Sequence, residues 1–310
     1  MKAIAKRRSR MSRQSSGRRV EITARDLEIF RLLARYRYLR SHFIHGFIGG
    51  DRTRLLDRLG RLYHDGRYIG RPPQQWQLPN CRHTPVIYEL DKRGAEALTE
   101  HGEDTTWARP AGQGQLLHSL MACEIVAAIE LAARDHALLR FVPLQEILSH
   151  PRMSPAARAR ARRDTVPIHG LNNAAVVPDA VFGLEYRVGA EKTYRFFALE
   201  ADRDTMPLTR RKSAGSNHIE KLRRYRTIIE QGIHRTQLGL PNLFVLTVTS
   251  TQPHLERMTE AAGRAIGPSR YFLFMAMPHL GTDGEGLKMN RLLYAPWVRV
   301  GAEALCLQKT

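Results

Sequence analysis

The sequence has few cysteines, few acidic residues and no long apolar run. Its three cysteines, Cys81, Cys123 and Cys306, lie far apart and lack the C-x-x-C spacing of zinc sites. This pattern argues against a disulfide framework and favours reduced thiols, so we expect a cytoplasmic protein. No apolar stretch approaches the roughly 20 residues that cross a bilayer, and the first residues lack the apolar segment of a signal peptide. We therefore expect no membrane partner.

The shortage of acids leaves a strong excess of positive charge. The 310 residues contain 49 Lys and Arg against 30 Asp and Glu, a formal net charge of +19. Such an excess favours a polyanionic partner, most often nucleic acid, although a solvated basic surface without a partner would look the same. Residues 1–19 contain no acid at all. We expect them to form a disordered basic tail that follows phosphates when DNA is bound.

Residues 20–102 have the pattern of a small DNA-binding domain. Three helices are expected after the capping residues Thr23, Ser41 and Asp51, and the third should end at Gly66. A β-hairpin is expected from residues 67–69 and 86–90, followed by a helix that Asp91 caps. The order of two helices, a turn, a basic helix and a wing is typical of a winged helix-turn-helix domain.

The third helix has a polar face suited to double-stranded DNA. Its candidate DNA-binding residues are Arg52, Thr53, Arg54, Arg58 and Arg61. The N-terminal residues of a recognition helix enter the major groove first, and arginine binds guanine or phosphate. Two alternatives remain: a helical bundle with a solvated basic face, and a winged helix that contacts protein. Domains of this type often dimerise, so a homodimer is also considered.

A polar segment at residues 103–115 is expected to be a linker, and residues 116–310 to form a second domain. The pattern predicts helices at residues 118–137 and 253–266, and a further helix that Asn217 caps and that contains residues 219–229. Strands are predicted at residues 141–148, 176–184, 193–202, 243–249, 271–277 and 292–295, with a hairpin turn at Gly189 and an exposed basic loop at residues 151–167. The expected fold is a mixed α/β sheet with flanking helices, and the whole chain is a two-domain α+β protein.

Acidic residues lie at the ends of two apolar strands of this second domain. Asp179 follows Val177-Pro178, and Glu200 and Asp202 close the run that begins at Phe197. Alternate residues of a strand share a face, so Glu200 and Asp202 should point the same way. If Asp179 is their neighbour, the carboxylates form an oxygen-rich site of the kind that Mg²⁺ or Mn²⁺ prefers. The alternative is a structural network in which Glu200 and Asp202 pair with basic residues nearby, namely Arg203, Arg195 or the cluster at residues 210–212.

The order of elements and these acids resemble the PD-(D/E)xK nuclease fold. In this resemblance Asp179 matches the first acid and Glu200 the second, while Asp202 occupies the position of the lysine. Some relatives carry that lysine on the following helix, where Lys221 is the candidate. Glu124 matches an acid on the first helix and would join Asp179 and Glu200 as a metal ligand. The resemblance implies catalytic roles for Asp179, Glu200, Asp202 and Lys221 if the site is active.

Taken together, the chain resembles the replication-relaxation family of plasmids and mobile elements over roughly residues 20–280. The resemblance is carried by His118 with Glu124, Pro178-Asp179, the run from Phe197 to Thr205, and Lys221 to Tyr225. It implies DNA binding tied to plasmid transfer, replication or its transcriptional control, with relaxosome or replication proteins as further partners. The first hypothesis is a DNA-binding protein with an inactive nuclease-like domain. The second is a metal-dependent DNA endonuclease that the winged helix targets.

Overall fold

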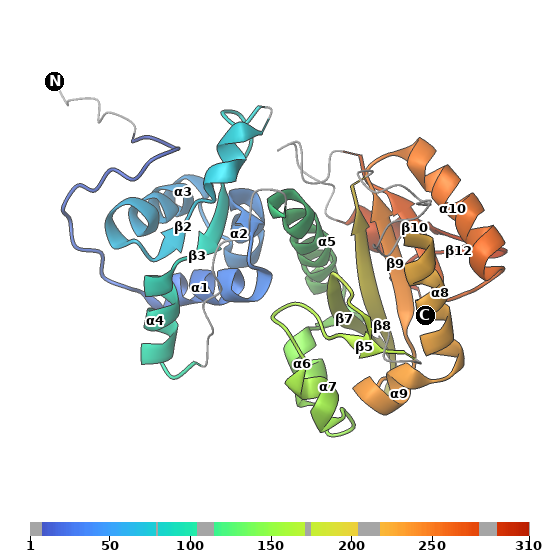
Figure 1. Cartoon of the computed structure of the whole chain (residues 1–310). Coiled ribbons are helices and arrows are strands. Elements are labelled where there is room, and N and C mark those ends of the chain that lie inside the picture. The colour runs from blue at the N-terminus through green and yellow to red at the C-terminus, as the bar shows by residue number, and fades with distance from the viewer. Residues whose placement is uncertain are drawn as a thin grey trace. The chain divides into compact units, whose positions relative to one another are not determined.

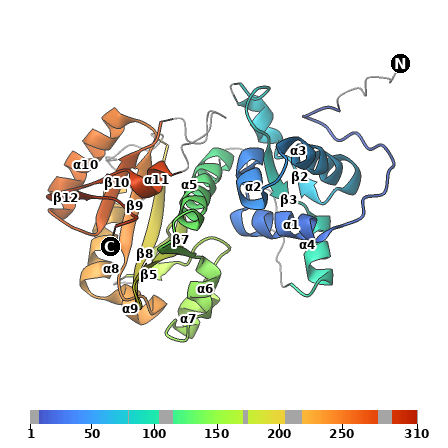
Figure 2. The ribbon, with the colours of Figure 1, turned by 180° about the vertical axis from the view of Figure 1, so that it is seen from behind.

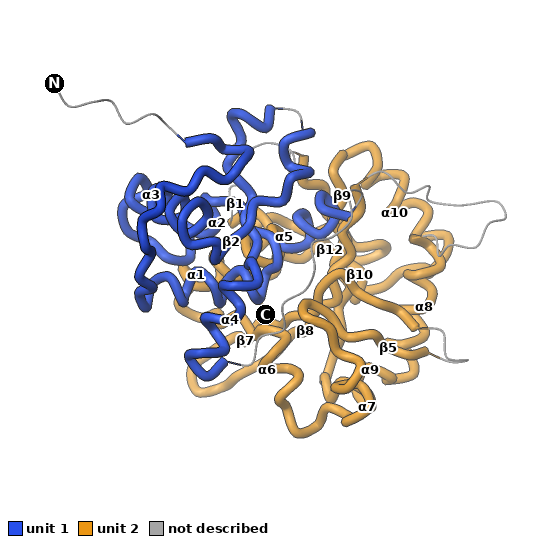
Figure 3. The backbone as a smooth tube through the Cα atoms, turned by 60° about the vertical axis from the view of Figure 1, so that its left-hand side comes forward, with its two compact units in different colours: residues 1–123, 281–286 blue, residues 124–280, 287–310 orange. Residues whose placement is uncertain are grey.

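The computed structural model describes residues 8–78, 80–103, 115–170, 175–203, 218–278 and 290–309. The described residues up to Cys123 form one compact unit, unit 1, and those from Glu124 onward form unit 2 (Figure 3). The division falls within a single helix, α5 (Leu116–Arg134). Most of the predicted linker, and the predicted helix cap Asn217, lie outside the described residues.

Unit 1 combines helices with a small antiparallel sheet. Its elements are α1 (Ala24–Tyr36), β1 (Leu39–Arg40), α2 (Ser41–Ile48), α3 (Arg52–Arg61), the π-helical turn η1 (Leu62–Gly66), β2 (Ile69–Gly70), the 3₁₀ turn η2 (Pro73–Gln77), β3 (Ile87–Leu90) and α4 (Lys92–Glu100). The strands are ordered β1-β3-β2, with Leu39 opposite Tyr88 and Ile69 opposite Leu90. The predicted helices and the hairpin of residues 67–90 are therefore present.

Local sequence signals fix the helix ends of unit 1. Thr23 and Asp26 form a reciprocal capping box at the start of α1. The Asp51 carboxylate accepts a hydrogen bond from the Arg54 backbone N–H at 2.8 Å and so caps α3. Between α2 and α3, Gly50 has a φ of 74°, which glycine adopts without steric cost. Ser41, in contrast, is the first residue of α2 and makes no side-chain cap, because Arg40 occupies the cap position.

Residues 8–19, part of the segment expected to be a disordered tail, have defined contacts with unit 1. Arg8 forms an ion pair with Asp65 of η1 at 2.6 Å. Arg13 forms one with Asp91 at 2.5 Å, next to β3. We call residues 8–19 the arm, because these contacts hold it along η1 and the β2–β3 hairpin.

Unit 2 is built on a seven-stranded mixed sheet in the order β12-β11-β10-β9-β8-β7-β4. Its strands are β4 (Leu139–Val142), β7 (Ala180–Val188), β8 (Glu191–Asp202), β9 (Phe244–Thr249), β10 (Phe272–Ala276), β11 (Trp297–Arg299) and β12 (Ala302–Leu305), with β5 (Ile168–His169) and β6 (Ala175–Val176) as a separate pair. Strands β8, β9 and β10 run parallel, and β7 pairs antiparallel with β8. This register aligns the ends of β8 and β9, where the candidate site lies.

Helices cover both faces of this sheet. They are α6 (Leu144–Ser149), α7 (Pro155–Ala159), α8 (His218–Glu230), α9 (Ile233–Leu238), α10 (Gln252–Ile266) and α11 (Arg291–Tyr294), together with α5. Helices α8 and α10 lie side by side on one face, and α5 lies on the other (Figures 1 and 2). The buried Tyr225 of α8 and Met258 of α10 belong to the main apolar core, with Val245 of β9 and Phe272 of β10.

The far end of the chain is joined to the centre of unit 2. The buried Tyr186 hydroxyl on β7 donates to the Leu307 carbonyl at 2.7 Å. Arg195 on β8 donates to the Lys309 carbonyl. The residues after β12 therefore complete the packing around β7 and β8.

Three predictions for unit 2 were wrong in detail. The strand predicted for residues 141–148 ends at Val142, because Pro143 has no N–H for a ladder and Leu144 begins α6. The edge strand predicted for residues 292–295 is the helix α11, since a short apolar pair such as Leu292-Leu293 fits either structure. The predicted loop of residues 151–167 contains α7. The hairpin of β7 and β8 is confirmed, with Gly189 at a φ of 62°.

The expectation that no apolar stretch approaches the length of a membrane span was wrong for α5. Within the described chain, this helix alone is long and apolar enough to cross a membrane. Of its most apolar stretch, 78% is buried in the protein. It is therefore packed like a core helix.

Candidate functional site

The three acids predicted from the strand ends lie at one end of β7 and β8. Asp179 immediately precedes β7, and its backbone N–H donates to the Leu199 carbonyl at 2.8 Å. Its carboxylate accepts a hydrogen bond from the Ala201 N–H, also at 2.8 Å. Asp179 is thereby held against β8 between Glu200 and Asp202, the two acids that close that strand.

Glu200 is buried and has a partner for each carboxylate oxygen. Its Oε1 accepts a hydrogen bond from the Tyr225 hydroxyl at 2.6 Å, and its Oε2 contacts the Lys221 ammonium group. Both partners come from α8, one helical turn apart. Burial raises the pKa of Glu200 to about 7, and the neighbouring Asp179 adds to this, although Lys221 opposes it. The group therefore gains or loses a proton near neutral pH.

Asp202 has a different partner from Glu200. Its Oδ2 lies 3.2 Å from Nε2 of His254, which is in the first turn of α10. His218, the first residue of α8, is also buried here, and its Nε2 has no hydrogen-bond partner among the described residues. Burial lowers the pKa of His218 to about 4, an effect that Lys221 and His254 reinforce and Asp202 opposes. This end of β7 and β8 thus joins three carboxylates with two histidines, a lysine and a tyrosine.

Two of the three predicted metal ligands, Asp179 and Glu200, belong to this group. Glu124 is fully buried on α5. Within the described ranges, no set of three or more His, Cys, Asp or Glu side chains has the geometry of a metal site. The cation that contacts Glu200 is the Lys221 ammonium group. A metal at Glu124, Asp179 and Glu200 stays a prediction, and Glu200 would have to exchange this ammonium for the ion.

For the alternative of structural ion pairs with arginine, the described residues show other partners. Arg195 is bound to the backbone near Lys309, while Glu200 pairs with Lys221 and Asp202 with His254. The basic cluster at residues 210–212 lies outside the described residues. An arginine network does exist elsewhere, around the buried Glu185 of β7. There Arg140 holds the pKa of Glu185 down to about 2.

The second candidate site is the surface of α3 in unit 1. Arg52, Thr53, Arg54 and Arg61 are exposed there. The first three lie at the helix N-terminus, directly after the cap Asp51. Their backbone position is fixed, and their side chains are free to meet a ligand.

Arg58, the fifth predicted DNA-binding residue, has a structural role. Its guanidinium forms two hydrogen bonds with the carboxylate of Asp26, at 2.8 and 2.5 Å, and a third with the Glu21 carbonyl at 2.6 Å. Asp26 is only 1% exposed. Burial alone would raise the pKa of Asp26, but the hydrogen bonds from Arg58 and Thr23 lower it. Arg58 therefore joins α3 to the start of α1.

A comparison with known families identifies the chain. The sequence model of the replication-relaxation family matches residues 30–243, which is more than half of the sequence. The protein belongs to the replication-relaxation family. Comparisons with curated proteins and with solved structures found no match.

The match to the replication-relaxation family includes α3 and most of the site in unit 2. Asp179, Glu200, Asp202, Lys221 and Tyr225 all lie within it. His254 lies beyond residue 243, although it contacts Asp202 inside the matched range.

Sequence reasoning did not select His218 or His254 for this site. His254 sits at the N-terminal end of an amphipathic helix, next to Pro253, where histidine is unremarkable. The one available signal was position, because α8 is the next described element after β8 and α10 is the next after β9. Residues in the first turns of such helices lie close to the strand ends.

Proposed function

We propose that the protein is a DNA-binding protein of a mobile genetic element, acting in plasmid transfer, replication or its transcriptional control. Unit 1 would be a winged helix-turn-helix domain, with α2 and α3 as the helical pair and β2–β3 as the wing. Membership of the replication-relaxation family supports a role in replication or relaxation of such elements. We expect the protein to act in the cytoplasm, with relaxosome or replication proteins, or a second copy of the chain, as further partners.

The observation that carries this proposal is the exposed Arg52-Thr53-Arg54 at the capped N-terminal end of α3. The Arg25 guanidinium donates to the Gly49 carbonyl at 2.6 Å and so supports the turn between α2 and α3. A helix held in this way can enter the major groove with its first residues foremost. Arg52 and Arg54 can then donate to guanine or phosphate, and Thr53 can contact either kind of group.

A binding titration tests the proposal. We expect the double variant Arg52→Ala/Arg54→Ala of the whole 310-residue chain to bind duplex DNA more weakly. The dependence of log Kd on log salt should fall by about 2, because two cationic contacts are lost. Arg235→Ala with Arg257→Ala is the matched control, since it removes two exposed arginines from unit 2. Equal weakening in both variants would mean that only net charge matters, and recognition by α3 would be rejected.

In this proposal unit 2 has a PD-(D/E)xK nuclease-like fold that serves as a scaffold. Both oxygens of Glu200 already have partners, and Asp202 stands where the nuclease pattern has its lysine. The ammonium of Lys221 neutralises the charge that a metal ion would otherwise balance. These contacts favour a stable, closed arrangement.

Endonuclease activity is the second candidate function. It is favoured by the convergence of Asp179, Glu200 and Lys221 at one end of β8. Mg²⁺ or Mn²⁺ held by Asp179 and Glu200, with Glu124 or Asp202, would stabilise charge on the phosphate and lower the pKa of the attacking water. Lys221, released from Glu200, would orient that water or neutralise the phosphate.

Incubation of supercoiled and linear DNA with the protein and Mg²⁺ or Mn²⁺ separates the two functions. Cleavage that Asp179→Ala and Glu200→Ala both abolish would establish the endonuclease. Intact DNA with all three proteins, together with unchanged DNA binding, would establish the scaffold.

A further inference from the structure

The end of the arm is held against the C-terminal end of α3 at two points. On one side, the backbone N–H and hydroxyl of Ser16 donate to Asp65 of η1, at 2.6 and 3.0 Å. On the other, Arg58 of α3 donates to the Glu21 carbonyl at 2.6 Å. Gly17 lies between these anchors with a φ of 73°, a conformation that glycine adopts readily. The intervening residues therefore form a short loop with both ends fixed.

Two arginines on this loop lie at the same end of α3 as two others. Arg18 and Arg19 are exposed on the loop, and Arg61 and Arg67 are exposed at the end of α3 and directly after η1. Val20 lies beside η1, since a Cβ placed on Gly66 would be 3.6 Å from the Val20 Cβ. Each residue extends the chain by at most about 3.6 Å, so the backbone of Arg18 and Arg19 stays within roughly 7 Å of Val20. We name these four residues the arginine cluster.

The charges of the arginine cluster are available for a partner. None of its four side chains forms a hydrogen bond or ion pair with another described residue. Asp65 already accepts from Ser16 and is paired with Arg8. The exposed acids Glu21 and Asp57 are nearby in the sequence, but neither forms an ion pair with an arginine of the cluster among the described residues. Positive charge is therefore in excess at this end of α3, and a polyanion relieves the repulsion between the guanidinium groups.

The arginine cluster continues the exposed face of α3. Arg54 and Arg61 are seven residues apart and therefore lie on the same side of the helix. Arg58, between them, is turned toward Asp26 and leaves that side. A helix of 10 residues is about 15 Å long, whereas the major groove is about 12 Å wide. If the first turn of α3 occupies the groove, its other end reaches the backbone at the border of the groove.

We propose that the arginine cluster binds the phosphate backbone of duplex DNA beside the groove that α3 enters. The inference rests on the proposed DNA-binding function and adds a second contact to it. Arginine binds phosphate with two parallel hydrogen bonds, and such contacts fix position without reading sequence. The cluster supplies affinity and register, while Arg52, Thr53 and Arg54 supply discrimination between bases.

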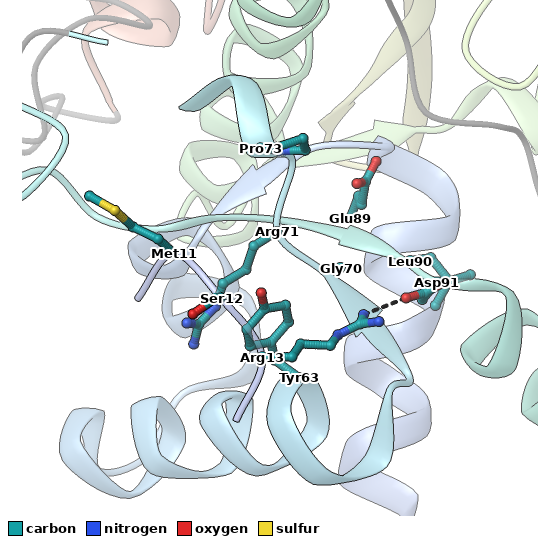
Figure 4. Close-up of a pocket in the computed structure, with 10 residues that line it drawn as sticks. All are labelled: Met11, Ser12, Arg13, Tyr63, Gly70, Arg71, Pro73, Glu89, Leu90 and Asp91. Carbon is teal, nitrogen blue, oxygen red and sulfur yellow. Dashed lines mark hydrogen bonds and ion pairs between the residues drawn. The ribbon is translucent and has the colours of Figure 1, made fainter. Parts of the chain in front are cut away.

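The first part of the arm is less suited to an anion. Between it and the β2–β3 hairpin lies a cavity of about 350 Å³ (Figure 4). Its lining includes Arg13 and Arg71 but also Glu89 and Asp91, so the charges cancel. Arg13 is paired with Asp91, and the Arg71 guanidinium lies 4.1 Å from the centre of the Tyr63 ring. Phosphate binding is therefore assigned to the arginine cluster.

The test compares the double variant Arg18→Ala/Arg19→Ala with the wild-type chain. DNA binding is measured on two duplexes of equal length and unrelated sequence. We expect the salt dependence of log Kd to fall by about 2 and binding to both duplexes to weaken by the same factor. Adding Arg61→Ala and Arg67→Ala should lower the salt dependence by about 2 more. The melting temperature of the double variant should not change, because Arg18 and Arg19 are exposed and form no hydrogen bond or ion pair with another described residue.

Arg235→Ala with Arg257→Ala is again the charge-matched control, and it should leave the salt dependence close to that of the wild type. An unchanged salt dependence in the Arg18/Arg19 variant, or an equal fall in the control, would overturn the inference. So would weakening on one duplex only, which would indicate base recognition. If Arg52→Ala with Arg54→Ala weakens binding while the Arg18/Arg19 variant does not, the inference fails and the proposed function stands. A wild-type protein without affinity for DNA would reject both.

Discussion

In unit 1 the charged residues that mark a candidate site lie on the surface, whereas in unit 2 they are buried and bound to one another. Arg52 and Arg54 are exposed at the start of α3. Glu200 and Asp202 are 5% and 8% exposed, and each contacts a basic side chain. An exposed charge is hydrated and can exchange water for a ligand at little cost, while a buried carboxylate needs a partner at all times. A ligand for Glu200 must therefore compete with Lys221 and Tyr225.

The largest effect should come from removing a buried carboxylate. We expect Glu200→Ala to lower the free energy of unfolding by about 3 kcal/mol, because Lys221 and Tyr225 lose their common partner. Calorimetry or urea unfolding would measure this. Glu191→Ala, an exposed acid at the start of the same strand β8, is the control and should change stability by less than about 0.5 kcal/mol. Similar values for the two variants would break the contrast between buried and exposed charge.

Arg58 and Arg54, both on α3, allow a paired charge and an exposed charge to be compared within unit 1. Arg58→Ala should lower the free energy of unfolding by about 2 kcal/mol, since the buried Asp26 loses two hydrogen bonds. Arg54→Ala should leave stability nearly unchanged and weaken DNA binding. Thermal unfolding and a salt titration of DNA binding on the same samples would show this reciprocal pattern. If Arg58→Ala strongly weakened DNA binding and left stability normal, Arg58 would be a DNA-binding residue, as the sequence predicted.

Glu200 should also make the stability of unit 2 depend on pH. Its pKa is raised in the folded protein to about 7, from an ordinary value of 4.5. The folded state therefore binds more protons between these values, and the free energy of unfolding should fall as pH rises from about 4.5 to 7, at a rate near 1 kcal/mol per pH unit. Buried histidines such as His218, with lowered pKa, act in the opposite direction below about pH 6.5.

The difference between the wild type and Glu200→Gln isolates the carboxylate. Glutamine does not titrate, so that difference should decrease from acid to neutral pH in unfolding experiments at a series of pH values. A constant difference would show that Glu200 ionises at its ordinary pKa.

The smallest effect should come from paired charges on the surface. Arg264 and Glu260 form an ion pair on α10 at 2.5 Å, with both side chains 68% exposed. Arg264→Ala should change the free energy of unfolding by less than about 0.5 kcal/mol, because water screens such pairs. A loss comparable to that of Arg58→Ala, measured by the same thermal unfolding, would mean that pairing matters more than burial.

Local features of the fold could be predicted from the sequence. Thr23, Asp51 and Gly189 act on neighbours only a few residues away, so their roles as caps and turn are visible in the sequence itself. The β7–β8 hairpin follows from two apolar runs around that glycine. The pairing of β8 with the later strand β9, in contrast, depends on packing over many residues.

Part of each candidate site could not be predicted for the same reason. Arg54 and Arg58 have equivalent positions in the pattern of α3, and only the contact with Asp26, 32 residues earlier, distinguishes them. Likewise, 52 residues separate His254 from Asp202. The acids at the end of β8 were conspicuous because carboxylates are rare in apolar strands, but their partners are of types common on any helix.

The order of the contacts along the chain has a consequence for the nascent protein. The three strands of the sheet in unit 1 and the helices α1 to α4 have been synthesised once the ribosome reaches residue 100. In the seven-stranded sheet of unit 2, the edge strand β12 begins only at Ala302. Glu200 leaves the ribosome 25 residues before its partner Tyr225. The strand β9, which pairs with β8, is synthesised later still. The first sheet can therefore form during translation. The carboxylate stays in water until α8 arrives to cover it.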